Sequence, residues 1–133
     1  MPDVMVMRPG DLDGNTPQTP GLKRFEAVSS RLSESKELWM GLSVLPVGAR
    51  TGVHHHGDSE TALYVLRGVG RWWVGDDLDD PREAHAGDFV FIPPNVVHWE
   101  ENGSPTEPVE MIVARSTQDA IVVNLDREIP HRG

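Results

Sequence analysis

The stretch Gly48–Gly68 reads GARTGVHHHGDSETALYVLRG, with three consecutive histidines, an acidic residue four places later and a run rich in β-forming residues. Successive side chains of a β-strand point to opposite faces. If residues 53–56 are extended, His54 and His56 point the same way, with Cα atoms roughly 6.5–7 Å apart, and His55 points the other way. Two imidazoles at this spacing can converge on one metal ion.

A second stretch, residues 87–102, reads GDFVFIPPNVVHWEEN and supplies a third histidine. Its apolar strand is followed by a stiff corner at Pro93-Pro94-Asn95, and β structure resumes before His98. The corner can fold His98 across to His54 and His56. Three neutral imidazoles, with or without a carboxylate, suit one divalent transition metal ion such as Fe, Zn, Ni, Mn or Cu.

The remaining sequence consists of short β-rich segments closed by turn-forming residues, for example TALYVLRG, RWWVGDD and GDFVFIPP. No segment has a long apolar stripe of helical period, and only residues 30–39 could contain a helical turn or two. This pattern predicts an all-β sandwich or barrel. Residues 1–21 are rich in Pro, Gly and Asp, so we expect an arm that is at most partly ordered, followed by one barrel domain over residues 22–133.

Composition narrows the possible functions. The chain has 133 residues, about the size of one domain, and no cysteine, which excludes disulfides and sulfur metal ligands. Its 21 acidic and 12 basic side chains give a formal charge of −9. A nucleic-acid partner is not expected, because neutralising phosphates needs a basic surface. The N-terminus has no long apolar run, so we expect no membrane association and a cytoplasmic location.

The two histidine stretches resemble the paired motifs of the cupin superfamily. The first cupin motif reads G-X5-H-X-H-X3,4-E-X6-G, and Gly48, His54, His56 and Glu60 match its first part. This resemblance implies a double-stranded β-helix, or jelly-roll barrel, with a metal ion held inside.

The second cupin motif reads G-X5-P-X-G-X2-H-X3-N. Gly87, Pro93, His98 and Asn102 match it, and Asn95 stands where the family usually has Gly. Both Gly and Asn tolerate positive φ, so we expect the same backbone conformation at this position. The resemblance covers roughly residues 39–115.

One departure concerns the acidic ligand of the first motif. Seven residues, not six, separate Glu60 from Gly68. Counted forward from His56, the ligand position falls on Glu60; counted back from Gly68, it falls on Thr61. Neighbouring strand residues face opposite sides, so only one of the two can point inward. A site of three histidines with Glu60 nearby is favoured, and a β-bulge that turns Glu60 inward is the alternative.

Glu100 has the same strand parity as His98. In a straight strand its carboxylate would face the cavity near the metal and could act as a general base, a role that Glu60 could also fill. The alternative is a solvated strand end beside the Asn102-Gly103 turn. Sequence parity alone does not choose between them.

The aromatic residues predict how the strands are covered. Trp72 and Trp73 are adjacent, so they must face opposite sides. The strand at residues 89–92 is apolar on both faces, with Phe89 and Phe91 on one face, which predicts burial by the core on one side and by a second subunit on the other. We therefore expect a homodimer, which a monomer mass by light scattering would contradict.

Resemblance to cupins implies a metal-dependent enzyme that acts on a small polar molecule, with activities that include oxygenases, isomerases, decarboxylases and lyases. Histidine-rich ligation with open coordination positions makes a dioxygenase-type oxidoreductase chemically reasonable. The alternative is a non-catalytic module that binds or senses a metal or a small metabolite. Tight ligand uptake without turnover would distinguish the second from the first.

Overall fold

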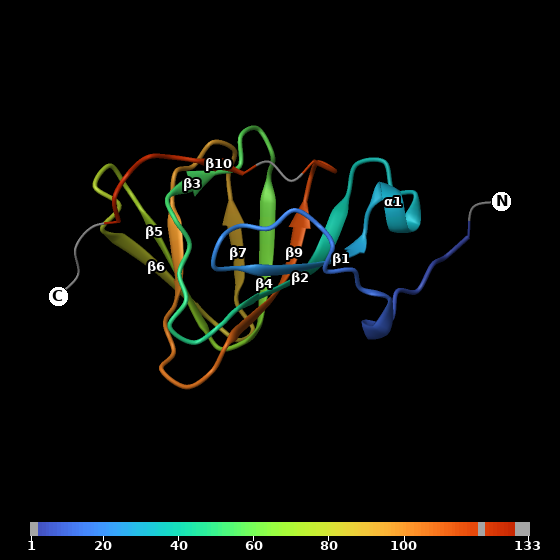
Figure 1. Ribbon diagram of the computed structural model, residues 1–133, viewed down its shortest axis with the longest axis horizontal. Coiled ribbons are helices and arrows are strands. Elements are labelled where there is room, and N and C mark those ends of the chain that lie inside the picture. The colour runs from blue at the N-terminus through green and yellow to red at the C-terminus, as the bar shows by residue number, and fades with distance from the viewer. Residues whose placement is uncertain (1–2, 120–121, 130–133) are drawn as a thin grey trace.

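The computed structural model describes residues 3–119 and 122–129, and most of its regular structure is β-strand (Figure 1). The α-helix α1 (Ser30–Ser33) is a single turn and lies within residues 30–39, where a helical turn or two was expected. The side chain of Ser29 caps it by accepting the Leu32 N–H. In chain order the elements are η1 (Pro9–Asp11), β1 (Lys23–Val28), α1 (Ser30–Ser33), β2 (Trp39–Leu45), β3 (His54–His55), β4 (Thr61–Arg67), β5 (Val69–Val74), β6 (Asp80–His85), β7 (Phe89–Ile92), β8 (Trp99–Asn102), β9 (Val109–Arg115) and β10 (Val123–Asn124). Over the described ranges no helix has the length and apolarity needed to cross a bilayer.

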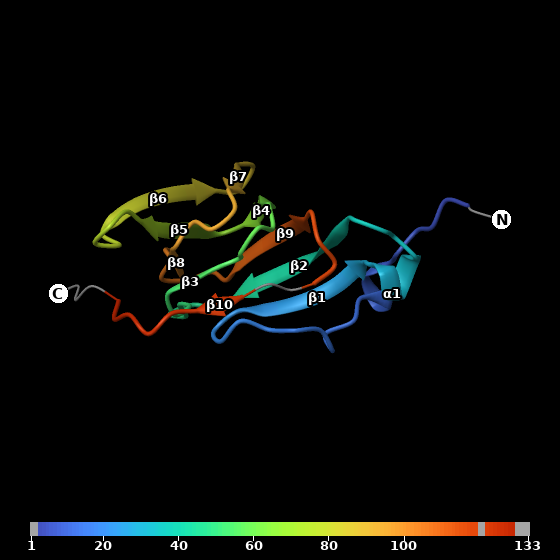
Figure 2. The same ribbon diagram turned by 90° about the horizontal axis from the view of Figure 1, so that it is seen from above.

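The strands form two facing antiparallel layers. The larger sheet has the order β1-β2-β9-β4-β7 and the smaller has β6-β5-β8, while β3 pairs with β10. Figure 2 separates the layers, with β5 and β6 on one side and β1 and β2 on the other. In each sheet, some neighbouring strands are not consecutive in the chain. Two facing antiparallel sheets connected in this way are typical of a jelly roll. The all-β, double-stranded β-helix prediction is therefore confirmed.

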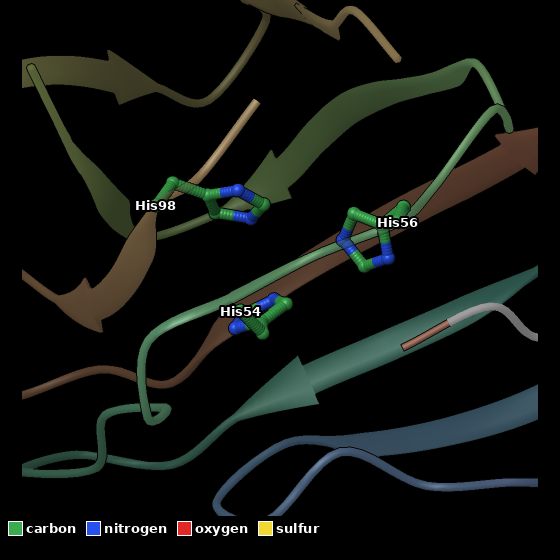
Figure 3. Close-up of side chains that lie close together, drawn as sticks. All are labelled: His54, His56 and His98. Carbon is green, nitrogen blue, oxygen red and sulfur yellow. The ribbon is translucent and has the colours of Figure 1, made fainter. Parts of the chain in front are cut away.

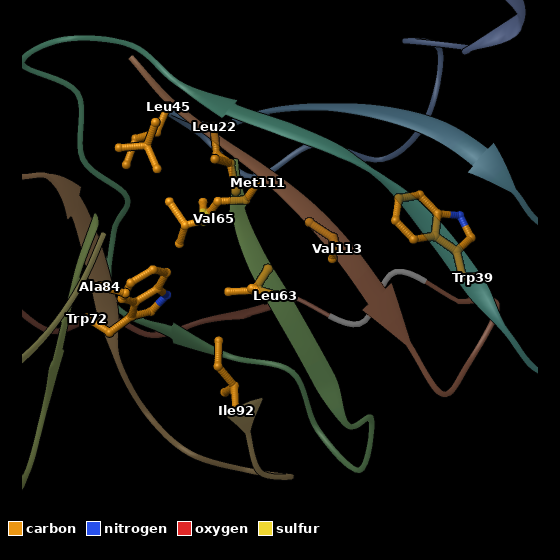
Figure 4. Packing of buried hydrophobic residues seen from close by; sticks show 11 residues of the cluster. Leu22, Trp39, Leu45, Leu63, Val65, Trp72, Ala84, Ile92, Met111 and Val113 are labelled. Atoms are coloured by element: carbon orange, nitrogen blue, oxygen red, sulfur yellow. The ribbon is translucent and has the colours of Figure 1, made fainter. Parts of the chain in front are cut away.

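The main hydrophobic core lies between the two sheets (Figure 4). Trp72 of β5 belongs to this cluster, whereas its neighbour Trp73 belongs to a second cluster and stacks on Trp99 with ring centroids 5.3 Å apart. The predicted opposite orientation of the two tryptophans is confirmed. The main cluster comprises Leu22, Trp39, Leu45, Leu63, Val65, Trp72, Ala84, Ile92, Val109, Met111 and Val113.

The segment before β1 contacts that strand. Asp13 exchanges two backbone hydrogen bonds with Glu26, of 3.0 and 2.8 Å. The Gln18 side chain accepts from the Arg24 N–H at 2.6 Å and donates to its carbonyl at 3.0 Å. Thr19 is buried, with its hydroxyl 2.7 Å from a guanidinium nitrogen of Arg24. This segment therefore fixes one end of β1, and a domain boundary at residue 22 stays a prediction.

The corner at Asn95 adopts the expected backbone conformation, with φ of 61°. It also joins the two histidine stretches: the Asn95 N–H donates to the Gly57 carbonyl at 2.7 Å, and its side-chain amide donates to Asp58 at 3.1 Å. The corner thereby fixes the position of the segment that carries His98.

Replacing Asn95 with alanine should lower the free energy of unfolding by about 1 kcal/mol, because a left-handed conformation costs an ordinary residue roughly 1–2 kcal/mol. Glycine, which adopts positive φ without strain, should stay within about 0.5 kcal/mol of the wild type. Urea denaturation of both variants checks this. An alanine variant as stable as the wild type would contradict it.

Strand β7 is buried on one face only within the single chain. Ile92 is buried, but the side chains of Phe89 and Phe91 are 81% and 57% exposed. The exposed face is the one expected to meet a second subunit, and β7 is the edge strand of the larger sheet. Within the chain, the Phe89 ring contacts the Tyr64 ring of the neighbouring β4, with centroids 4.7 Å apart. The homodimer inferred from this strand stays a prediction.

Candidate metal centre

Three histidines from the two stretches meet between the sheets (Figure 3). His54 lies on β3, His56 follows that strand, and His98 immediately precedes β8. Their ring centroids are 4.4, 5.0 and 5.3 Å apart, and one ring nitrogen from each lies within 4.8 Å of the others. All three are buried. His55, on the opposite side of β3, is half-buried and accepts the Gly57 N–H, so the predicted parity is confirmed.

Backbone pairing places His54 opposite His98. Each of the two residues donates its N–H to the carbonyl of the other at 2.9 Å. The pairing uses no side-chain atom, so it positions both rings whatever their protonation state. The sequence-distant stretches are therefore joined at the site itself.

Hydrogen bonds fix the tautomers of these two rings. The Nδ1 atom of His54 lies 2.8 Å from the Gly52 carbonyl, and that of His98 lies 3.0 Å from the Val96 carbonyl. A carbonyl can only accept, so each Nδ1 carries the proton and each Nε2 presents a lone pair. Both Nε2 atoms are buried without a hydrogen-bond partner. A lone pair left unpaired in this way is what a metal ligand requires.

Burial keeps these rings neutral. It lowers the pKa of His54 to about 4. The neighbouring His98 also lowers this pKa, and its effect is larger than that of the hydrogen bond to the Gly52 carbonyl, which raises the pKa. Burial likewise lowers the pKa of His98. Neutral imidazoles can bind a cation at pH 7 without first losing a proton. The donor set and its electrostatics therefore fit a borderline divalent transition metal ion.

The structure follows the register in which Thr61 points inward. Thr61 is buried on β4, opposite Ile92 on one side and Arg115 on the other. Glu60 is exposed, and its N–H donates to the Ser116 hydroxyl outside the histidine cluster. Glu60 as a fourth ligand is thus corrected: its side chain is exposed and lies outside the cluster of three histidines. The register shift of the β4–β9 ladder lies further along the strand, between Val65 and Arg67, and does not turn Glu60 inward.

Glu100 lies inside the molecule rather than at a solvated strand end. It is 5% exposed, pairs with Trp72 across the β5–β8 ladder and lines the same cavity as His56. Burial raises the pKa of its carboxyl group, although His54 and Arg24 oppose this. The Trp72 indole also favours the charged form, but its N–H does not reach hydrogen-bond geometry. A buried carboxyl group near the histidines can hold or move a proton.

Two spaces reach the cluster. The inner cavity, of about 20 Å³, is enclosed between the sheets; a mostly apolar cavity of about 220 Å³ reaches His98 from the side of β5 and β7. The inner cavity is lined by Leu22, Arg24, Ser43, His56, Thr61, Leu63, Ile92, Glu100, Met111, Val113, Arg115 and Val122.

The sequence interpretation missed two arginines of the inner cavity. Arg115 could have been found, because it shares strand parity with the apolar residues Met111 and Val113. Arg24 gave no comparable signal, since its place in the cavity depends on pairing with Ser43 of β2. A charged residue at the start of a β-rich run is otherwise typical of a solvated position.

The chain is similar to known proteins over the part that carries the site. The model of the cupin domain matches residues 41–115. An uncharacterized protein of Methanocaldococcus jannaschii, MJ1618, is 38% identical over 79 residues, which are 59% of this chain and 54% of that protein. The match therefore spans about half of the curated relative.

Solved structures share the fold. The polyketide cyclase RemF from Streptomyces resistomycificus superposes with a TM-score of 0.76 at 17% identity, covering 95% of this chain and 88% of its own. Oxalate decarboxylase from Bacillus subtilis superposes with a TM-score of 0.67 at 25% identity, covering 81% of this chain but 28% of its own. With both histidine motifs inside the matched segment and the same fold in these structures, the chain belongs to the cupin domain family.

Proposed function

We propose that this cupin is a metal-dependent enzyme that acts on a small polar molecule. The observation that carries the proposal is that three buried histidines each offer a ring nitrogen within 4.8 Å of the others, while the Nε2 atoms of His54 and His98 have no hydrogen-bond partner. A merely structural barrel has no need for desolvated lone pairs, which cost free energy to bury.

The position of each residue in the site indicates its role. His54, His56 and His98 would hold the metal ion, and the carbonyls of Gly52 and Val96 keep two of the rings in the ligating tautomer. When bound, such an ion supplies Lewis acidity or activates oxygen. Enclosure between the sheets keeps bulk water from the reacting groups.

Glu100 is the candidate for proton transfer, because its buried carboxyl group lines the cavity that His56 also lines. A Glu100→Gln variant should lose roughly 10²–10⁴-fold in kcat for whatever reaction is detected, because a positioned acid or base contributes about that much. Its metal content should match the wild type.

Glu101 provides the matched control. It is the next residue along β8, and its carboxylate accepts the Trp73 indole N–H outside the cavity. A Glu101→Gln variant should keep its kcat. Equal losses in the two variants would contradict a specific role for Glu100.

The reaction class follows from the chemistry of the donor set and from the similar proteins. Three imidazoles with open positions suit dioxygenase-type chemistry, and also a decarboxylase, isomerase or lyase. One of the similar structures concerns the Mn(II) centres of Bacillus subtilis oxalate decarboxylase. This supports a divalent ion such as Mn.

The test is a turnover screen on protein prepared without an affinity tag and reconstituted with Fe, Mn, Zn, Ni or Cu in turn. Oxygen consumption, CO₂ release and isomerisation are followed across small hydroxy, keto and carboxylic acids. Metal-dependent turnover that disappears in the His98→Ala variant supports the enzyme. Tight, stoichiometric metal uptake without turnover across the screen would favour the alternative, a binding or sensing module.

A further inference from the structure

The inner cavity beside the histidines contains two buried positive charges. Arg24 and Arg115 are each 6% exposed. Burying a charge is costly unless it is paired and hydrogen-bonded. Among residues 3–119 and 122–129, no carboxylate forms an ion pair with either guanidinium; Glu100, Glu26 and Asp119 act on them only at longer range.

Contacts fix the position of the Arg115 guanidinium, but its hydrogen-bond donors are not all paired. Its guanidinium lies 3.8 Å from the centroid of the Trp39 ring, and Nη2 donates to the Gln118 carbonyl at 3.2 Å. Its Nε is buried without a partner. Burial lowers the pKa of Arg115 to about 10, so the group stays charged at neutral pH. Arg24 has one side-chain hydrogen bond among the described residues, to the Thr19 hydroxyl.

Two more polar atoms of the same cavity lack partners. The hydroxyls of Ser43 and Thr61, residues that are 0% and 5% exposed, form no hydrogen bond. Strand pairing explains the grouping, because Ser43 lies opposite Arg24 in the β1–β2 ladder and Thr61 lies opposite Arg115 in the β4–β9 ladder. A guanidinium can only donate, and a hydroxyl can donate beside it. Convergent donors with excess positive charge match an acceptor-only anion.

We propose that this cavity binds the carboxylate of a small anionic substrate, with Arg24 and Arg115 supplying the charge and Ser43 and Thr61 donating hydrogen bonds. The proposal rests on the proposed function, because it makes the anion the substrate that is presented to the histidine cluster. His56 lines the same cavity, so a carboxylate seated there lies next to the metal ligands.

Size restricts the ligand. A cavity of about 20 Å³ is only slightly larger than one water requires. A carboxylate of one or two carbons therefore enters only if a lining side chain moves, and Met111, which is unbranched and adaptable, lies in that wall. Larger acids would need the remainder of the molecule to extend out of the cavity.

Anion binding is measured on metal-free protein, so that its outcome is independent of metal loading. Sodium formate and sodium acetate are titrated by calorimetry and by thermal denaturation, at constant ionic strength set with sodium chloride. Formamide and acetamide, which have similar shapes without the charge, are the matched controls. We expect the carboxylates to bind and raise the Tm, and the amides to do neither.

Removing the hydroxyls provides the decisive variants. Ser43→Ala and Thr61→Val should each weaken carboxylate binding about tenfold or more, the loss expected for a hydrogen bond to a charged group. Without ligand, each variant should keep a Tm equal to or above the wild type, because the hydroxyl it loses is buried and unpaired. A purely structural role would move stability in the opposite direction.

Ser29 is the matched control, because it is a buried serine whose hydroxyl is fully paired. The hydroxyl donates to the Glu26 carboxylate and accepts the Leu32 N–H. Ser29→Ala should lower the Tm and leave carboxylate affinity unchanged. Arg115→Lys keeps the charge but loses the planar donor set, and should reduce affinity further than either hydroxyl variant.

No carboxylate binding, equal binding of carboxylates and amides, or unchanged affinity in both hydroxyl variants would overturn the anion site. Metal content by elemental analysis, measured on the same proteins, separates this from the proposed function. Intact metal uptake with failed carboxylate binding would reject the anion site alone. Carboxylate binding without any metal uptake would reject the metal enzyme.

Discussion

Replacing His98 with alanine is expected to abolish stoichiometric metal binding. Loss of a group that merely orients a metal ligand costs roughly 10–100-fold in affinity, so removal of one of three ligands should cost at least 100-fold. The fold should survive, because His98 pairs with His54 through backbone atoms alone. Elemental analysis of protein made without an affinity tag measures the change, and His54→Ala should give the same result.

His85 is the matched control for this experiment. It lies at the end of β6, its side chain is 61% exposed, and it is outside the cluster. A His85→Ala variant should keep the wild-type metal content. Equal metal in wild type and His98→Ala would rule out His98 as a ligand and remove the basis of the proposed enzyme.

Acidification should destabilise the metal-free protein before most carboxylates titrate. The pKa of His54 is about 4 in the folded state, against an ordinary imidazole value of about 6.5 in the unfolded chain, so the unfolded chain binds the proton first as the pH falls. The stability that this group contributes is complete above about pH 6.5 and is lost as the pH approaches 4. The shift corresponds to about 3 kcal/mol. His98 acts in the same direction.

Glu100 opposes this trend, because its pKa is raised in the folded protein. As the pH falls, the folded protein binds a proton at Glu100 before the unfolded chain does, and this favours folding. The free energy of unfolding, measured by urea denaturation between pH 7.5 and 4 with a chelator present, should therefore fall less than the two histidines alone would give. His54→Gln should flatten the pH dependence. A flat profile in the wild type would show that the imidazoles are not desolvated as the structure places them.

Several features could be predicted because they depend on neighbours in the chain. The alternation of strand side chains separated His55 from His54 and His56, and turn-forming residues divided the chain into short strands. The corner at Asn95 needed a residue that tolerates positive φ, and the observed φ is 61°. The cupin resemblance implied that His98 joins the pair formed by His54 and His56.

Other features depended on how strands pair across the sheets. Parity could say that only one of Glu60 and Thr61 points inward, but the pairing of β4 with β7 and β9 decided for Thr61. The sequence left Glu100 between a cavity and a solvated strand end, and the packing of β8 against β5 buried it.

The local sequence by itself determined the all-β class, the turns and which histidines share a strand face, because these follow from the period of the backbone and from allowed φ values. Only the tertiary structure decided that Arg24 and Arg115 share one cavity with His56. Their charges meet there because β1 and β9 both pair with β2, a long-range register set by the whole sheet.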